Sequence, residues 1–527
     1  MKHLLGLLLV LSGSAGAFAA GEGERAEAKL PTFTILNGAE TPTLDGSLIE
    51  NSGSSRIHLA LFENLLSYDP KTNDALPGIA ESWSVSDDLL TYTFRLRDVT
   101  WSDSTPITAE TVVDSWLRTL NPTTRSPYAW MMGMIIRGAN EYTYGEGEVG
   151  PEVVQIRALD TKTFQMDLVR PAAYLPGMLP HSVFGVLPTH VIEQKGDDWT
   201  LTHNFVSNGP FLLKERNRNR LVVVRNDEYW DAENVGLGEI VFISSDDDAD
   251  RYDMYLNGEA DWVRGGIPAG QIDVAKNRPD YQASARLATY YLEVNHTKPP
   301  FDDVRVRRAL AMTINRREIV DDILDGGQIP AVRITPPLPG YAPPDGLSEN
   351  VSMAQQLLAD AGYVDGEGFP AITILYNTSS GHRPIMEHVQ ARWEHNLGIM
   401  VEIKEEEWAN VLARGKLQDF DILRMGWVGD YQDADTFLQL FVTGSGQNFG
   451  KFSNPEFDRL VEQAAAMPAG SARFEVLRQA EEVLIDEEQA ILPIYHYADI
   501  DLVDTDTWGG WFATTLGVHP LKDLHLK

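Results

Sequence analysis

The pattern of apolar and polar positions is clearest in the last third of the chain. Short apolar, β-branched runs alternate there with segments whose apolar residues recur every three or four positions. These patterns are typical of buried strands and of amphipathic helices, respectively. They predict strand, helix, strand, helix and strand over residues 371–376, 384–397, 399–405, 408–416 and 420–427. Such a βαβαβ order indicates neighbouring parallel strands, so we expect an α/β fold.

The third of these strands carries two opposite charges near its end. Arg424 lies inside the apolar run, and Asp430 follows six residues later. A charge in a buried strand costs free energy unless another group pairs it. One interpretation is an internal salt bridge between Arg424 and Asp430. The other is a pocket that holds a zwitterionic ligand, with Gly426 and Gly429 allowing close approach and Trp427 supplying an apolar wall.

Side chains that follow the other two strands favour the pocket. His382 comes after the first strand, and Glu406, Glu407 and Trp408 come after the second. In parallel sheets the ligand crevice lies outside the carboxyl ends of the strands. The three strand ends therefore bring groups of complementary chemistry to one edge.

The remainder of the chain gives weaker signals. We expect a small polar loop over residues 51–55, a helix over 56–66, and a strand over 491–496. Thr108 and Ser352 are predicted to cap helices, because a hydroxyl at this position accepts a backbone N–H. The tail, 508–527, is expected to return to the first domain.

The amino terminus predicts export. Residues 1–19 read as a signal peptide: Lys2 and His3 precede an apolar run, and Ala19 ends a small-x-small cleavage site. The run is too short to span a membrane. Residues 20–30 read as a flexible lead-in. The chain has no cysteine, hence no lipoprotein cysteine, and we expect a free periplasmic protein.

Charge and motifs exclude several other classes. A formal net charge of −34 repels nucleic acid and anionic membranes, so neither is expected as a partner. No nucleophile elbow, zinc motif or phosphate loop occurs. His388 and His395 lie two helical turns apart, too far for one ion. The acidic run 244–250 lacks the glycine and glutamate of a calcium loop and indicates a helix start instead. We expect no metal, no cofactor and no enzyme, with a secreted glycoside hydrolase as the distant alternative.

Six motifs carry a family resemblance over essentially the whole mature chain. The sequence resembles the periplasmic oligopeptide-binding proteins of solute-binding family 5, the receptors of peptide ABC importers. The motifs are Trp101-Ser102-Asp103-Ser104-Thr105-Pro106, Ser126-Pro127-Tyr128-Ala129, Val206-Ser207-Asn208-Gly209, Phe301-Asp302-Asp303-Val304-Arg305-Val306-Arg307, Tyr376-Asn377-Thr378-Ser379 before His382, and Gly426-Trp427-Val428-Gly429-Asp430-Tyr431.

The resemblance implies a periplasmic-binding-protein-like fold of class II, cluster C: two α/β lobes joined by a hinge, plus an extra lobe. Lobe I would comprise residues 30–62, 187–287 and 498–527, lobe II 63–186, and lobe III 288–497. Lobes I and III would close over a short peptide, with lobe II distant from the hinge. A monomer would then deliver the peptide to ABC permease subunits in the inner membrane. Related receptors for dipeptides, murein peptides or a non-peptide solute are the alternatives.

The resemblance also implies roles for individual residues. Asp430 would take the peptide α-ammonium, while Arg424 and His382 would offer charge to the carboxylate, His382 only when protonated. Trp408 and Trp427 would wall side-chain pockets, beside Gly426. Tyr128 would reach in from lobe II.

Four positions depart from the family pattern. Leu324 stands where some relatives offer a lysine to the carboxylate, which leaves the preferred peptide length open. Ala288 and Val428 stand where relatives form a disulfide, and Ser104 replaces the usual glycine of its turn.

Overall fold

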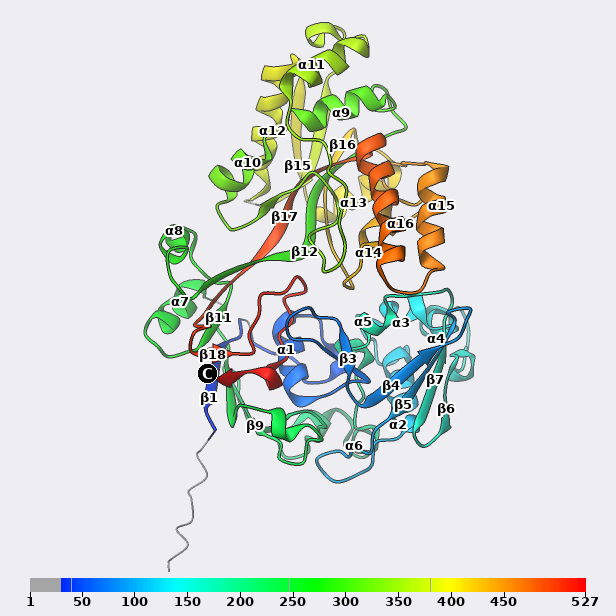
Figure 1. Ribbon diagram of the computed structural model, residues 1–527, viewed down its shortest axis with the longest axis vertical. Helices are drawn as coiled ribbons and strands as arrows, with labels where there is room; N and C mark the ends of the chain where they lie inside the picture. The colour runs from blue at the N-terminus through cyan, green and yellow to red at the C-terminus, as the bar shows by residue number, and fades with distance from the viewer. Residues whose placement is uncertain (1–29, 39, 246, 380) are drawn as a thin grey trace, which may run out of the picture.

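The computed structural model describes residues 30–527 except 39, 246 and 380. The signal peptide predicted over residues 1–19 and the lead-in up to residue 29 lie outside the described residues. Figure 1 shows an upper unit joined to a broader lower unit by two long strands. We call the upper unit lobe III and the left and right parts of the lower unit lobes I and II. The lobe bounds given above stay a prediction.

One 11-stranded sheet runs through lobes I and III. Its order is β15-β14-β16-β12-β17-β11-β1-β10-β9-β8, and β13 (Ile329–Pro330) pairs with β17. The strands are β15 (Val401–Glu406), β14 (Ile372–Asn377), β16 (Ile422–Val428), β12 (Tyr281–Val294), β17 (Ile491–Val503), β11 (Trp262–Arg264), β1 (Thr32–Leu36), β10 (Glu239–Ile243), β9 (Arg220–Arg225) and β8 (Phe211–Arg216). The two long members, β12 and β17, are the strands that cross between the lobes (Figure 1).

Lobe III contains the predicted βαβαβ unit. Strand β14 pairs in parallel with β15 and with β16, which confirms the expected order and direction. The helices of this lobe pack on both sides of the sheet, where they bury two separate apolar clusters. They include α9 (Val304–Met312), α11 (Val351–Asp360), α12 (His382–Leu397), α13 (Trp408–Leu417), α14 (Asp435–Leu438), α15 (Pro455–Ala465) and α16 (Ser471–Glu482).

Lobe II is built on a four-stranded antiparallel sheet of order β4-β5-β7-β6. Its first helix begins as predicted, because Thr108 and Thr111 form a reciprocal capping box. The elements are β2 (Leu66–Tyr68), β3 (Ala75–Pro77), β4 (Ala80–Val85), β5 (Thr91–Leu96), α2 (Ala109–Leu120), α3 (Ala129–Ile135), α4 (Ala139–Tyr144), β6 (Ile156–Asp160), β7 (Thr163–Asp167) and α5 (Leu175–Met178).

Lobes I and II share one hydrophobic core. A continuous cluster joins residues of β1, α1 (Ser52–Leu61), the lobe II sheet and the tail, including Trp508 and Leu524. The tail therefore packs against the first domain, as the sequence predicts. Because their cores are continuous, lobes I and II form one body, and the chain crosses from this body to lobe III through β12 and β17. The ladder between these two strands is interrupted between Ala285 and Thr289, at the crossing.

A second contact joins lobe III to lobe II. The ring of Tyr431 stacks on that of Tyr174, with centroids 3.9 Å apart and planes at 12°. Gln432 donates to the carbonyl of Thr72 at 2.7 Å, and Tyr431 belongs to the core of the lower body. Lobe II thus contacts the loop that follows β16, although the resemblance implied only that it lies far from the hinge.

Four local expectations are wrong. Residues 51–55 are not a loop, because the side chain of Asn51 caps α1 at this point. The helix expected over residues 56–66 begins earlier, at Ser52, and ends earlier, at Leu61. Asn350, not Ser352, caps α11. The strand expected to end at residue 496 continues to Val503, since its second half forms the crossing into lobe I.

We expect the Tyr174–Tyr431 stack to hold the loop after β16 on the lower body. Tyr174→Ala should lower the free energy of unfolding by about 3–5 kcal/mol, the usual cost of deleting a buried aromatic ring. Tyr174→Phe keeps the ring and should stay close to the wild type. Urea unfolding of both variants measures the difference, and equal midpoints would contradict the assignment.

Candidate ligand-binding cleft

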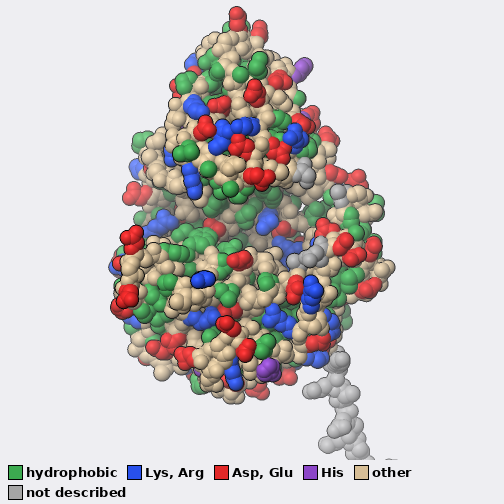
Figure 2. Space-filling model, turned by 180° about the vertical axis from the view of Figure 1, so that it is seen from behind, with side chains coloured by type: hydrophobic (Ala, Val, Ile, Leu, Met, Phe, Trp, Pro, Cys, Tyr) green, Lys and Arg blue, Asp and Glu red, His purple; other side chains and the backbone are tan. Residues whose placement is uncertain are grey.

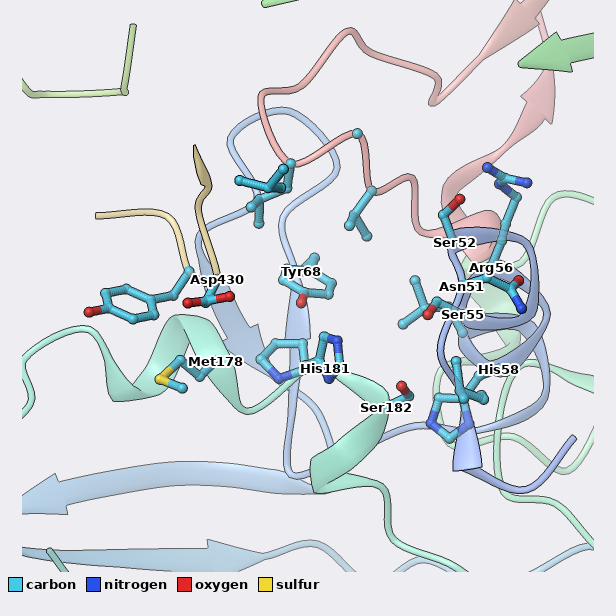
Figure 3. Close-up of a pocket in the computed structure, with 18 of the residues that line it drawn as sticks. Asn51, Ser52, Ser55, Arg56, His58, Tyr68, Met178, His181, Ser182 and Asp430 are labelled. Carbon is cyan, nitrogen blue, oxygen red and sulfur yellow. The ribbon is translucent and has the colours of Figure 1, made fainter. Parts of the chain in front are cut away.

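A cavity of about 450 Å³ lies where the three lobes meet. Figure 2 shows the surface hollowed between the upper and lower units. The cavity is lined by α1 and the three residues before it (49–51), by Tyr68, Tyr128 and His181 of lobe II, by the hinge, and by the loop 428–431. Figure 3 shows Asp430 on one wall and Asn51, Ser52, Ser55 and Arg56 on the other, with Tyr68 and His181 between them.

Asp430 presents a carboxylate to this cavity without a counterion. Its backbone N–H donates to Thr436 Oγ1 at 3.2 Å, which fixes the turn. Across the described part of the chain, no salt bridge reaches its carboxylate. Burial raises the pKa of Asp430 to about 6. Burial, together with the charge of Asp430, also raises the pKa of Tyr128, so the structure brings these two predicted residues together.

Arg424 lies in lobe III with only neutral partners. It is 8% exposed, its Nη1 donates to Asn377 Oδ1 and its Nη2 to Tyr497 Oη, each at 3.0 Å. Its guanidinium covers the face of Tyr290 at 4.3 Å, a cation–π contact. Arg424 is therefore a buried cation that, among the described residues, has no carboxylate beside it.

His382 lies beside Arg424, as predicted. Its ring is 5.5 Å from that of Tyr290, and its Nδ1 is 3.4 Å from the Tyr290 hydroxyl. Burial and the charge of Arg424 lower the pKa of His382 to about 4. His382 is thus neutral near pH 7 in this state, whereas the sequence alone suggested ordinary histidine titration.

The other predicted residues lie along lobe III. Gly426 leaves room for Arg424, since an added Cβ would meet Arg424 Nη2 and Tyr497 Oη at 3.4 Å. Trp427 is half-buried and donates to Thr436 Oγ1 at 3.4 Å. Trp408 is 43% exposed at the start of α13. None of the three lines the cavity that holds Asp430.

These positions decide between the two interpretations of Arg424 and Asp430. The two side chains do not form a salt bridge, and each has other neighbours. The internal salt bridge is therefore wrong. Each is a partly or fully buried charge without a counter-charge, which is costly in the free protein.

The described residues do not suggest a metal site, since no group of three potential ligands comes together among them. His388 is 3.5 Å from Glu318, and His395 is exposed. Asp247 caps α7 (Asp248–Leu256), which confirms the helix start predicted in the acidic run.

On the lobe I and lobe II side of the cavity, Tyr128 was predicted from the sequence, but most of the other residues were missed. Arg56, His58, Tyr68 and His181 line it, but they come from segments far apart in the sequence. The one usable signal was the cap at Asn51, which would have placed Arg56 on the second turn of a helix.

A second cavity, of about 560 Å³, continues the cleft on the other side of the hinge. It shares Asn51, Ser52, Arg56, Arg264 and Asp499 with the first. Leu324, the position where some relatives offer a lysine, lines this second cavity.

Comparisons with known proteins agree with this architecture. Residues 74–449 match the family of bacterial extracellular solute-binding proteins, family 5. The chain belongs to this family. It is 32% identical, over 509 residues, to the periplasmic oligopeptide-binding protein OppA of Salmonella typhimurium, covering 94% of this chain and 92% of the relative. The periplasmic-binding-protein-like fold with several lobes is thereby confirmed.

Two solved structures of the family differ in how well they superpose. The unliganded open form of the periplasmic murein tripeptide-binding protein MppA gives a TM-score of 0.87 at 30% identity, covering 95% of this chain and 98% of that one. Haemophilus influenzae OppA in complex with the peptide RPPGFSPFR gives 0.67 at 28% identity, covering 94% and 100%. The lobes of this chain are therefore arranged as in the open form.

We expect Asp430→Asn to stabilise the ligand-free protein at pH 7. The pKa of Asp430 is about 6 in the folded protein, against an ordinary 3.8, so the folded state binds a proton more tightly than the unfolded chain. This group's contribution to the free energy of unfolding therefore falls as pH rises from about 4 to about 6, by up to about 3 kcal/mol.

Thermal unfolding from pH 4 to 8 measures this effect. The variant should melt higher than the wild type at pH 7 and match it at pH 4. Glu50→Gln, which changes an exposed carboxylate on the same cavity, is the control. A lower melting temperature for Asp430→Asn at pH 7 would contradict the prediction.

Proposed function

We propose that the chain is the substrate-binding receptor of a peptide ABC importer and binds short peptides between lobes I and III. The observation that carries this proposal is the pair of unpaired charges. Asp430 is an anion in a cavity and Arg424 a buried cation, and they lie on one strand and its following loop. A zwitterionic chain would supply the missing partner at each end.

The separation of the two charges suits a peptide. Strand β16 ends at Val428, so Arg424 and Asp430 are separated by four residue steps of strand, about 13 Å, and by two of loop. Each residue of an extended ligand covers about 3.3–3.6 Å. The reach of the two side chains shortens the gap. A peptide of several residues fits this distance, whereas a single amino acid does not.

The lobe arrangement supports capture by closure. Arg424 and His382 belong to lobe III, while the loop with Asp430 is held against lobe II by the Tyr174–Tyr431 stack. Rotation about β12 and β17 would move the carboxylate site toward the lower body. Relatives named as oligopeptide- or murein-peptide-binding proteins support peptides over the non-peptide alternative.

The family supports a binding protein and not an enzyme. The relatives are periplasmic binding proteins, and we propose that this chain acts as a monomer outside the cytoplasm and delivers its peptide to permease subunits. In the described residues no helix is long and apolar enough to cross a membrane. Incubation of peptides with the purified protein should leave them intact, and reproducible cleavage would contradict the proposal.

We expect the peptide amino terminus to bind Asp430. Asp430→Asn should weaken binding of a tetrapeptide by about thirtyfold to several thousandfold, because removing one partner of a buried charge pair costs about 2–5 kcal/mol. N-acetylation of the peptide should cost the wild type the same factor and cost the variant little more. Calorimetry measures both, with Glu50→Gln as the control. Equal affinity for acetylated and free peptides would remove Asp430 from this role.

The affinity should also depend on pH. Asp430 must be ionised to pair with an ammonium group, and the pKa of Asp430 in the free protein is about 6. Affinity should therefore be constant from about pH 6 to about pH 7.5, fall below pH 6 by at most about tenfold per pH unit, and fall again as the peptide α-ammonium loses its proton near pH 8. Because the pKa of His382 is about 4, no loss from titration of His382 is expected between pH 6 and 8. Calorimetric titrations across this range test both statements, and Asp430→Asn should flatten the profile.

A further inference from the structure

Arg56 is a buried cation for which the function proposed above has no use. It lies on α1 and is 6% exposed. Its Nη1 donates to Asn37 Oδ1, and its guanidinium stacks over Trp262 at 4.8 Å. Within the described chain no carboxylate lies close enough to form an ion pair with it. Burial, followed by the charge of Arg264, lowers the pKa of Arg56 to about 9.

The position of Arg56 makes it accessible to a ligand in the cleft. It lines both cavities, at their junction, together with Asn51 and Ser52. In Figure 3 it lies on the wall opposite Asp430. The ten-residue helix α1 begins at Ser52 on this wall, and its first N–H groups and dipole favour a negative charge.

The other ionisable residues around the cavity differ from Arg56, because they are paired, exposed or, for the histidines, neutral. Arg264 is held by Asp499 and by the carbonyl of Gly517. Arg286 and Glu50 also line the cavity, and both side chains are exposed. His58, His181 and His519 line it as well, and burial lowers the pKa of each. Arg56 is thus a deeply buried cation opposite Asp430 that forms no ion pair among the described residues, although the charges of Asp501 and Asp499 act on it from nearby.

We propose that Arg56 and the amino-terminal turn of α1 form a carboxylate-binding subsite for peptides whose amino terminus is held by Asp430. This subsite is separate from Arg424 and rests on the peptide-binding function proposed above. It would serve a peptide too short to reach Arg424, through its terminal carboxylate, or an acidic side chain of a longer peptide. A guanidinium fork suits either carboxylate.

The subsite would replace the lysine that some relatives offer to the peptide carboxylate at the position of Leu324. An extended dipeptide spans only about 7 Å, less than the about 13 Å of strand from Arg424 to Val428, which the loop carrying Asp430 then follows. With leucine at position 324, Arg56 supplies a cation beside the second cavity. We therefore expect this receptor to bind dipeptides through residues that its sequence motifs do not reveal.

Calorimetry with four dipeptides separates the two sources of the carboxylate. The probes are Ala-Ala, Ala-Ala amide, Ala-Glu amide and Ala-Gln amide. We expect Arg56→Gln to weaken binding of Ala-Ala by about thirtyfold or more while leaving Ala-Ala amide unchanged. If the side chain is the source, the same loss will appear for Ala-Glu amide and not for Ala-Gln amide. Either pattern supports the subsite.

Two further variants show which arginine acts. Arg286→Gln, an arginine on the same cavity, should leave all four affinities unchanged. Arg424→Gln should weaken binding of tetra-alanine but keep the preference for Ala-Ala over its amide. If Arg56→Gln affects acids and amides equally, or if Arg286→Gln causes the loss instead, the subsite is overturned.

Arg424→Gln and the wild type provide tests that do not depend on folding of Arg56→Gln. Arg424→Gln that still prefers Ala-Ala over Ala-Ala amide, or Ala-Glu amide over Ala-Gln amide, supports the subsite, and one that shows neither preference overturns it. A wild type that binds tetra-alanine but shows no acid preference among the dipeptides overturns the subsite alone. A wild type that binds no peptide overturns the proposed function and the subsite together.

Discussion

The cost of burying charges without partners is the constraint on which this structure depends. Arg424 is buried and Asp430 partly buried in the ligand-free protein, and the two side chains do not form an ion pair. The surrounding fold must supply the free energy that holds them apart. Arg424 is stabilised by the Tyr290 face, Asn377 and Tyr497, all of which are neutral and so leave its charge available to a ligand.

The two-body construction follows from where the hydrophobic cores are continuous. Lobes I and II share a core, while lobe III has clusters of its own on the two faces of its sheet. The large sheet nevertheless passes through both bodies, because β12 and β17 belong to each. The chain therefore crosses between the bodies through two strands, and the interruption of their ladder between Ala285 and Thr289 lies at the crossing.

The sequence predicted what local periodicity and short motifs can encode. The βαβαβ unit, the capping of α2 and the neighbourhood of His382 and Arg424 all follow from patterns within a few dozen residues. The wall formed by Arg56, Tyr68 and His181 could not be predicted, since it depends on how lobes I and II pack. The pKa values of Asp430 and His382 were equally out of reach, because burial sets them. Asn51 was read as loop because its capping role shows only once the helix is known.

The pairing of Ala288 with Val428 has a consequence for handling the protein. These residues face each other across β12 and β16, at the hinge end of the strand that leads to Asp430, and the chain has no cysteine. Packing and hydrogen bonds alone hold this junction. Its geometry therefore cannot respond to thiol reagents or to the redox state of the compartment, and the same folded protein should result from reducing and oxidising conditions.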